Sequence, residues 1–163
     1  MDKNQAMIAF LQSCPTIQSN PLFFNFGKVE NDAHQATTKS DDVSLHKNYV
    51  DGSVLRRYTF SVDSYKSVAY NPVILGYTDE NLDDFANVQS ILDWINDQAD
   101  EGNYPAFGDN CIIEKMATLT TKPELLGVDT EVNPPLAVYR ISIQIDYIDT
   151  SKCIWNREEI ISI

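Results

Sequence analysis

Residues 51–65 read Asp-Gly-Ser-Val-Leu-Arg-Arg-Tyr-Thr-Phe-Ser-Val-Asp-Ser-Tyr, and this stretch decides the fold. From residue 53 onward the side chains alternate between two faces, which is typical of a β-strand with one packed face and one more polar face. One face carries Val54, Arg56, Tyr58, Phe60 and Val62, and the other carries Leu55, Arg57, Thr59, Ser61 and Asp63. Asp51-Gly52 predicts a hairpin before this strand, with a type I′ turn in which both residues take positive φ.

A second long strand is predicted at residues 136–148, where the odd-numbered positions from Ala137 to Tyr147 are apolar and alternate with polar ones. Shorter strands are predicted at residues 22–26, 33–38 and 111–118. Residues 120–135 hold Pro123, Gly127 and a proline pair, and are predicted to be a long loop.

Two helices are predicted, at residues 2–14 and 79–100, from apolar residues that repeat every three to four positions. Gly102 is expected to end the second helix as its C′ residue. The order of elements predicts an α+β fold with a mostly antiparallel sheet and two main helices packed on it. We expect a single domain over residues 1–148, followed by a C-terminal extension at 149–163 that is too apolar for a solvated end.

Composition narrows the functional classes. The chain of 163 residues has 24 acidic and 12 basic side chains, a net charge of −12. Specific nucleic-acid binding is not expected, because such domains carry basic patches that neutralise phosphates. The three cysteines are far apart and form no C-x-x-C pair, and neither a signal peptide nor a membrane span is recognisable. We expect a soluble protein made in the cytoplasm.

The sequence contains no nucleotide-binding glycine loop and no nucleophile elbow. His46 precedes Asp51-Gly52 by one residue too many for the His-x-x-x-Asp-Gly segment of some acyltransferases. No catalytic, cofactor-binding or metal-ligating residues are therefore predicted, and no enzymatic activity is expected. A small cytoplasmic enzyme and a monomeric acidic binding protein, such as a nucleic-acid mimic, remain as alternatives.

Four segments carry a resemblance that covers residues 5–150: the N-terminal helix ending at Ser13-Cys14-Pro15, the hairpin at 47–60, the acidic helix at 85–95 and the strand at 137–147. In this order and spacing the chain resembles the tail-terminator and neck proteins of tailed bacteriophages, often termed minor capsid proteins. The resemblance implies a virion protein of the tail or neck, assembled in the host cytoplasm.

Proteins of this family form hexameric rings that cap the tail tube, stop its polymerisation and join the tail to the head. The partners implied are further copies of the chain, the tail tube protein, a head-completion or neck protein and the sheath protein of a contractile tail. DNA would pass through the ring without specific binding, and no membrane or cofactor is implied. Another neck protein, for head completion or head–tail joining, is the alternative within this class.

Closing a ring requires contacts between two different faces of each subunit. Candidate interface residues are those expected at the surface in the hairpin, the predicted loop and the tail: Asp51, Gly52, Leu125, Leu126, Val128, Ile154 and Trp155. Arg56, Arg57 and Arg140 are added as side chains that either bridge subunits or pair with carboxylates across strands of the same chain.

Overall fold

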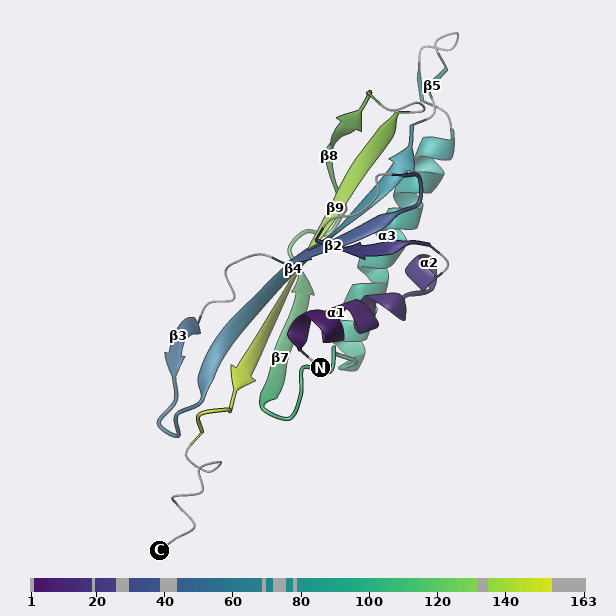
Figure 1. Cartoon of the computed structure of the whole chain (residues 1–163). Helices are drawn as coiled ribbons and strands as arrows, with labels where there is room; N and C mark the ends of the chain where they lie inside the picture. Colours follow the sequence, from purple (N-terminus) through teal and green to yellow (C-terminus); the bar gives the residue numbers. More distant parts are fainter. Residues whose placement is uncertain are drawn as a thin grey trace, which may run out of the picture.

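The computed structural model describes residues 2–18, 20–25, 30–38, 44–68, 70–71, 76–77, 79–131 and 135–153. Over these ranges the chain has an α+β fold with three helices and a mixed seven-stranded sheet (Figure 1). The helices are α1 (Lys3–Gln12), α2 (Pro15–Gln18) and α3 (Asp79–Glu101). The sheet contains β1 (Leu22–Phe24), β2 (His34–Thr38), β3 (Ser44–Asn48), β4 (Val54–Ser67), β7 (Cys111–Thr118), β8 (Glu124–Asp129) and β9 (Leu136–Asp149), and β5 (Tyr70–Asn71) and β6 (Gly76–Tyr77) form a separate small ribbon.

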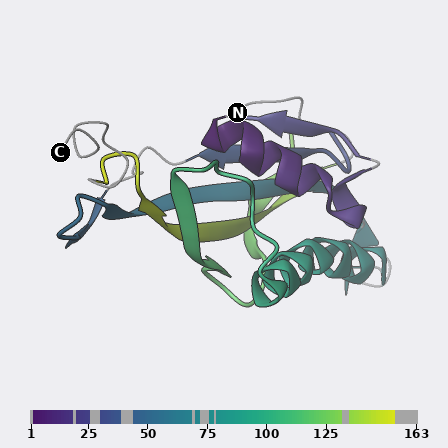
Figure 2. The same ribbon diagram turned by 90° about the horizontal axis from the view of Figure 1, so that it is seen from below.

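The sheet is built around β4 and β9, which pair antiparallel along the full 14 residues of each strand. Shorter strands flank this pair in two halves. In the upper half of Figure 1 the order is β1-β2-β4-β9-β8, and in the lower half β3 flanks β4 while β7 flanks β9. Figure 2 shows β4 and β9 side by side through the middle of the molecule, with the β3–β4 hairpin projecting beyond the helices.

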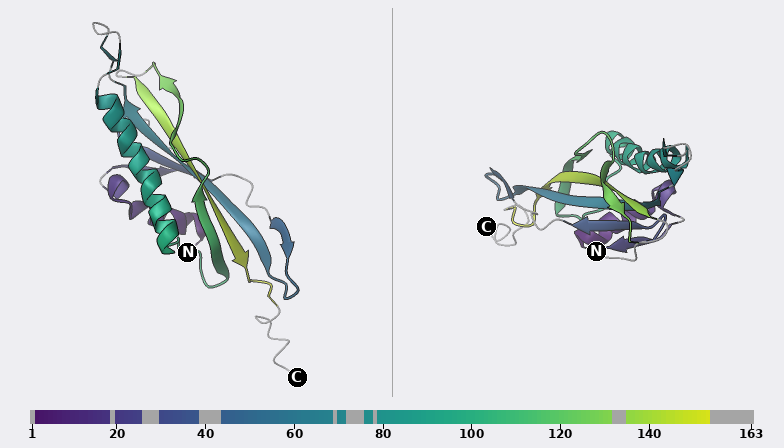
Figure 3. Two further views of the ribbon diagram at one scale, coloured as in Figure 1. Left: turned by 180° about the vertical axis from the view of Figure 1, so that it is seen from behind. Right: turned by 90° about the horizontal axis from the view of Figure 1, so that it is seen from above.

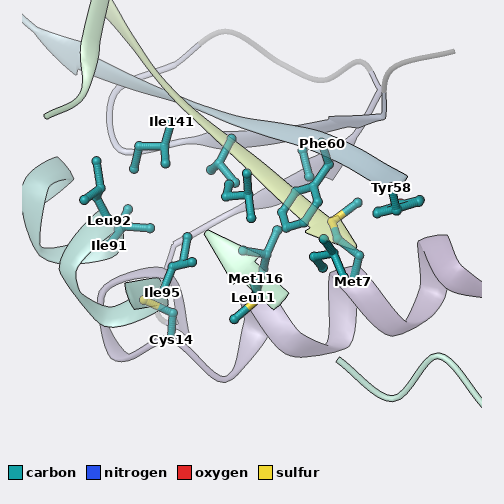
Figure 4. Packing of buried hydrophobic residues seen from close by; sticks show 14 of the residues in the cluster. Met7, Leu11, Cys14, Tyr58, Phe60, Ile91, Leu92, Ile95, Met116 and Ile141 are labelled. Carbon is teal, nitrogen blue, oxygen red and sulfur yellow. The ribbon is translucent and has the colours of Figure 1, made fainter. Parts of the chain in front are cut away.

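The predicted alternation is confirmed on β9, whereas on β4 the residues of both faces are buried from Tyr58 to Ser64. Phe60 lies opposite Ile143 and Val62 opposite Ile141, and all four side chains are fully buried. Figure 4 shows side chains from α1 and α3 meeting these strands in one core. The helices contribute Met7 and Leu11 from α1 and Ile91, Leu92 and Ile95 from α3. Burying each such side chain favours folding by about 1.5–3 kcal/mol.

The start of α1 and the end of α3 lie where the sequence indicates. The Asp2 carboxylate accepts a hydrogen bond from the Gln5 backbone N–H at 2.8 Å, and Oε1 of Gln5 accepts one from the Asp2 backbone N–H at 3.0 Å, so α1 begins with a capping box. Gly102, predicted as the C′ residue of α3, has φ of +74°. Its N–H bonds Ala99 O while Asn103 N–H bonds Gln98 O, which is a Schellman motif.

The prediction of a long loop at residues 120–135 is wrong, because Glu124–Asp129 form β8, an edge strand on β9. The sheet is mostly antiparallel as predicted, but β1 and β2 are parallel, which makes it mixed. The two main helices are confirmed, and Pro15, predicted only to stop the first helix, also begins the short α2. A proline suits that first helical position because its missing N–H would have no intrahelical partner.

The predicted type I′ turn is also wrong. Tyr49 N–H bonds Ser53 O and Gly52 N–H bonds Tyr49 O, so the loop has three residues, Val50, Asp51 and Gly52. Of these three described residues, Gly52 alone has positive φ, at +91°. This is the three-residue hairpin in which a glycine in the left-handed region follows a tight turn.

Candidate interaction surfaces

Asp51 and Gly52 lie at the tip of the projecting hairpin. They determine the shape of the turn and contact the segment that follows β9. The Asp51 carboxylate accepts hydrogen bonds from Ser53 N–H at 3.0 Å and Ser53 Oγ at 2.6 Å, which lower its pKa. Cys153 Sγ lies 3.5 Å from the other Asp51 oxygen. A Cβ on Gly52 would come within 2.5 Å of the Lys152 carbonyl oxygen, so the turn packs directly against the chain that leaves β9.

Two predicted interface residues, Ile154 and Trp155, lie outside the described residues. The described chain ends at Cys153, which is buried beside the hairpin tip.

The three predicted arginines each pair with a carboxylate of the same chain. Arg56 Nε lies 3.0 Å from Asp149, and Arg57 Nε lies 2.9 Å from Asp146. Arg140 makes two parallel bonds to Asp63, at 2.8 and 3.0 Å, and these raise the pKa of the guanidinium. The cross-strand alternative considered from the sequence is therefore present for all three.

Leu125, Leu126 and Val128 lie on β8, with exposed fractions of 54%, 43% and 42%. Every β8 residue from Glu124 to Val128 is exposed, and Asp129 is half-buried. A register shift between Leu125 and Gly127 places Leu126 in a β-bulge. Figure 3 shows β8 at the upper edge of the sheet, away from α1.

A shallow groove that the sequence did not indicate lies between α1 and β1. It has a volume of about 390 Å³, and a mostly apolar surface. Its lining consists of Asp2, Asn4, Gln5, Ile8, Ala9, Gln12 and Phe24. The amphipathic pattern of the first helix identified its buried stripe, but the strand that borders the other side of the groove could not be placed from sequence.

A polar cluster, also missed, occupies the upper end of the core. Period-two alternation continues along β4 past Val62, so Ser64 and Lys66 point inward as well. Ser64 Oγ lies 2.7 Å from Nδ1 of His34, and both residues are fully buried. Lys66 Nζ bonds Asp32 and the Asn87 side chain, which ties β4 to α3.

A hydroxyl beside an imidazole can act as a nucleophile and its base, but only where a substrate can reach it. Here neither side chain of the Ser64–His34 pair is exposed. Burial lowers the pKa of His34 to about 4, with the nearby Lys66 charge adding to the effect. Nε2 of His34 has no hydrogen-bond partner among the described residues. The pair therefore has the geometry of a buried structural contact.

Within the described residues no group of three or more histidine, cysteine or carboxylate side chains is arranged to hold a metal ion. None of the described helices has the length and apolar character to cross a membrane. Neither protein-family models nor the curated proteins give a significant match to the chain.

Proposed function

We propose that the protein is a structural subunit of a tailed-phage virion: a tail terminator that forms a ring on the tail tube, stops its polymerisation and joins the tail to the neck. The resemblance over residues 5–150 supports this proposal. The observation that carries it is β8, an apolar sheet edge that the described residues leave exposed.

The exposure of β8 is unusual for a strand that belongs to a folded sheet. Leu125, Leu126 and Val128 remain open to solvent, and β8 pairs only with β9 among the described strands. Exposed apolar edges promote association, and proteins that stay monomeric commonly protect them with charges, prolines, bulges or covering loops. The bulge in β8 and its terminal carboxylates, Glu124 and Asp129, interrupt this edge but leave its three apolar side chains exposed. An edge of this kind is expected in a subunit that is completed by another chain.

The charge distribution is compatible with a ring through which DNA passes. The net charge is −12, and each arginine in the described part of the chain is already paired with an aspartate. Guanidinium groups held by carboxylates are poorly available to phosphates, so DNA would meet a surface that repels it or releases it readily. This supports passage of DNA without specific binding.

The test is the mass of the purified protein by light scattering, alone and with assembled tail tubes, followed by negative-stain imaging of the tube ends. We expect a ring-sized species, or a ring at one end of each tube. A ring that binds the head connector but ignores tubes would assign the protein to another neck layer. A monomer that joins neither structure would refute the proposal.

A further inference from the structure

We propose that β8 of one subunit adds to the free edge of β1 in a second copy, with its apolar side chains over the groove between α1 and β1. The inference rests on the self-assembly that the proposed function requires, and it specifies the interface.

The two edges lie at opposite ends of the same half-sheet. In the order β1-β2-β4-β9-β8, β1 pairs only with β2 and β8 only with β9 among the described strands. Joining one edge to the other uses two different surfaces on each subunit. Such a heterologous contact generates a closed ring when the rotation between neighbours allows it.

Strand directions suit this junction. β8 and β4 both run antiparallel to β9 and therefore share a direction. β1 is parallel to β2, which runs antiparallel to β4, so β1 and β8 point in opposite directions. A rotation about an axis near the strand direction preserves these directions. The new pair would therefore be antiparallel.

The register suits it as well. Leu125 lies opposite Tyr139, Tyr139 opposite Ser64, Ser64 opposite His34, and His34 opposite Leu22. Directly paired residues share a face of the sheet, so Leu125 and Leu22 lie at one level and on the helix-covered face. In a continuous sheet Leu125 of one subunit would therefore project on the same side as the neighbour's groove. A shift of the added strand by two residues, which keeps every side chain on its face, would bring Leu125 level with Phe24, the β1 residue that lines the groove.

The groove is suited to apolar side chains. Phe24 and Ile8 line it from β1 and α1, and the exposed Ala9 keeps it open because its side chain is small. Strand addition supplies backbone hydrogen bonds, while a neighbouring pocket for side chains supplies specificity. β8 provides both an open edge and the leucines to fill the pocket.

The charges at the lower end of the junction are complementary. Tyr58 Oη bonds Asn4 at 2.7 Å, which places the start of α1, and with it Asp2, toward the lower half of the sheet. Exposed Lys122 precedes β8 on that same side. The added strand would therefore bring Lys122 toward the Asp2 carboxylate of the neighbour.

The experiment blocks each edge separately. Leu125→Lys places a charge on β8, and Ala9→Arg fills the groove. Ile112→Lys is the matched control, because Ile112 on β7 is also 54% exposed but lies in the lower half. Each variant is checked by circular dichroism and thermal unfolding, then weighed by light scattering. We expect both blocked variants to be folded monomers and the control to assemble as the parent does.

Mixing the two blocked variants gives the deciding result. Ala9→Arg retains an intact β8, and Leu125→Lys retains an intact groove. An equimolar mixture should therefore form a dimer with one copy of each variant and assemble no further. If the parent forms rings but the blocked variants do too, the interface lies elsewhere and the proposed function survives. If the mixture stays monomeric although the control forms rings, head-to-tail addition is refuted. A parent that never assembles, alone or on tubes, refutes the function itself.

Discussion

Replacing Gly52 with alanine tests how firmly the hairpin tip holds the chain that leaves β9. Two costs are expected. The φ of +91° is unfavourable for a residue with a Cβ, by about 1–2 kcal/mol. The new Cβ would also lie 2.5 Å from the Lys152 carbonyl oxygen, so the backbone must shift, at a cost of about 1–3 kcal/mol. Together the two costs lead us to expect Gly52→Ala to lower the free energy of unfolding by about 2–5 kcal/mol.

Gly102→Ala is the matched control because it separates these two costs. Gly102 also has positive φ, at +74°, but a Cβ there would have no atom within 4 Å. Only the backbone cost of about 1–2 kcal/mol should appear. Since about 1 kcal/mol shifts Tm by about 2–4 °C in a domain of this size, Gly52→Ala should unfold several degrees below Gly102→Ala.

The assays are urea unfolding, which gives the free energies, and thermal unfolding, which gives Tm, each followed by far-ultraviolet circular dichroism. Both glycine variants are made in the Leu125→Lys background, so that assembly does not add to the measured stability. Equal losses for the two variants would refute the close approach of Lys152 to the turn. A harmless Gly52→Ala would refute the turn geometry itself.

Three further perturbations test other parts of the structure. Arg140→Lys keeps the charge but loses the two-pronged bond to Asp63, and should cost about 1 kcal/mol in urea unfolding. The pKa of His34 is about 4 in the folded protein against an ordinary 6.5, so its contribution to stability is complete above pH 6.5 and is lost as the pH falls toward 4. His34→Asn should remove that part of the pH dependence in a series of urea titrations, and an unchanged slope would contradict the burial of the imidazole. Asp2→Asn retains a good N-cap whereas Asp2→Ala should cost about 1 kcal/mol in the same assay, yet both should weaken assembly measured by light scattering.

The long central strands could be predicted because the polarity of their residues alternates. Phe60 and Val62 face the helix-covered core, and Ser61 and Asp63 lie on the opposite face of β4, where they too are buried. The sequence of β8 lacks this pattern. Its sequence, Glu-Leu-Leu-Gly-Val-Asp, has no alternation, because the described residues leave both faces of the strand exposed from Glu124 to Val128. Backbone pairing with β9 holds it in place, and that pairing leaves no periodic signal.

The same distinction explains the candidate surfaces. Leu125, Leu126 and Val128 were identified correctly as exposed apolar residues, although they belong to a strand and not to a loop. The groove depends on the placement of Phe24 against α1, which is a tertiary contact between β1 and a helix. The hairpin turn was misassigned because Asp51 uses its side chain to bond Ser53 and so keeps an ordinary φ, which leaves Gly52 alone to take the positive value.

Repulsion between the net charges of the subunits and attraction between ion pairs at the junction make opposite predictions for the effect of salt on assembly. Each subunit carries −12, so neighbours repel one another at low ionic strength. Screening shortens the range of that repulsion from about 10 Å at 0.1 M salt to about 3 Å at 1 M. An exposed pair such as Lys122 with Asp2 contributes only about 0–1 kcal/mol, and backbone pairing and apolar contact are little affected by screening. We therefore expect association, measured by light scattering, to strengthen with added sodium chloride. Association that weakens steadily with salt would mean that ion pairs, and not strand addition at β1 and β8, hold the subunits together.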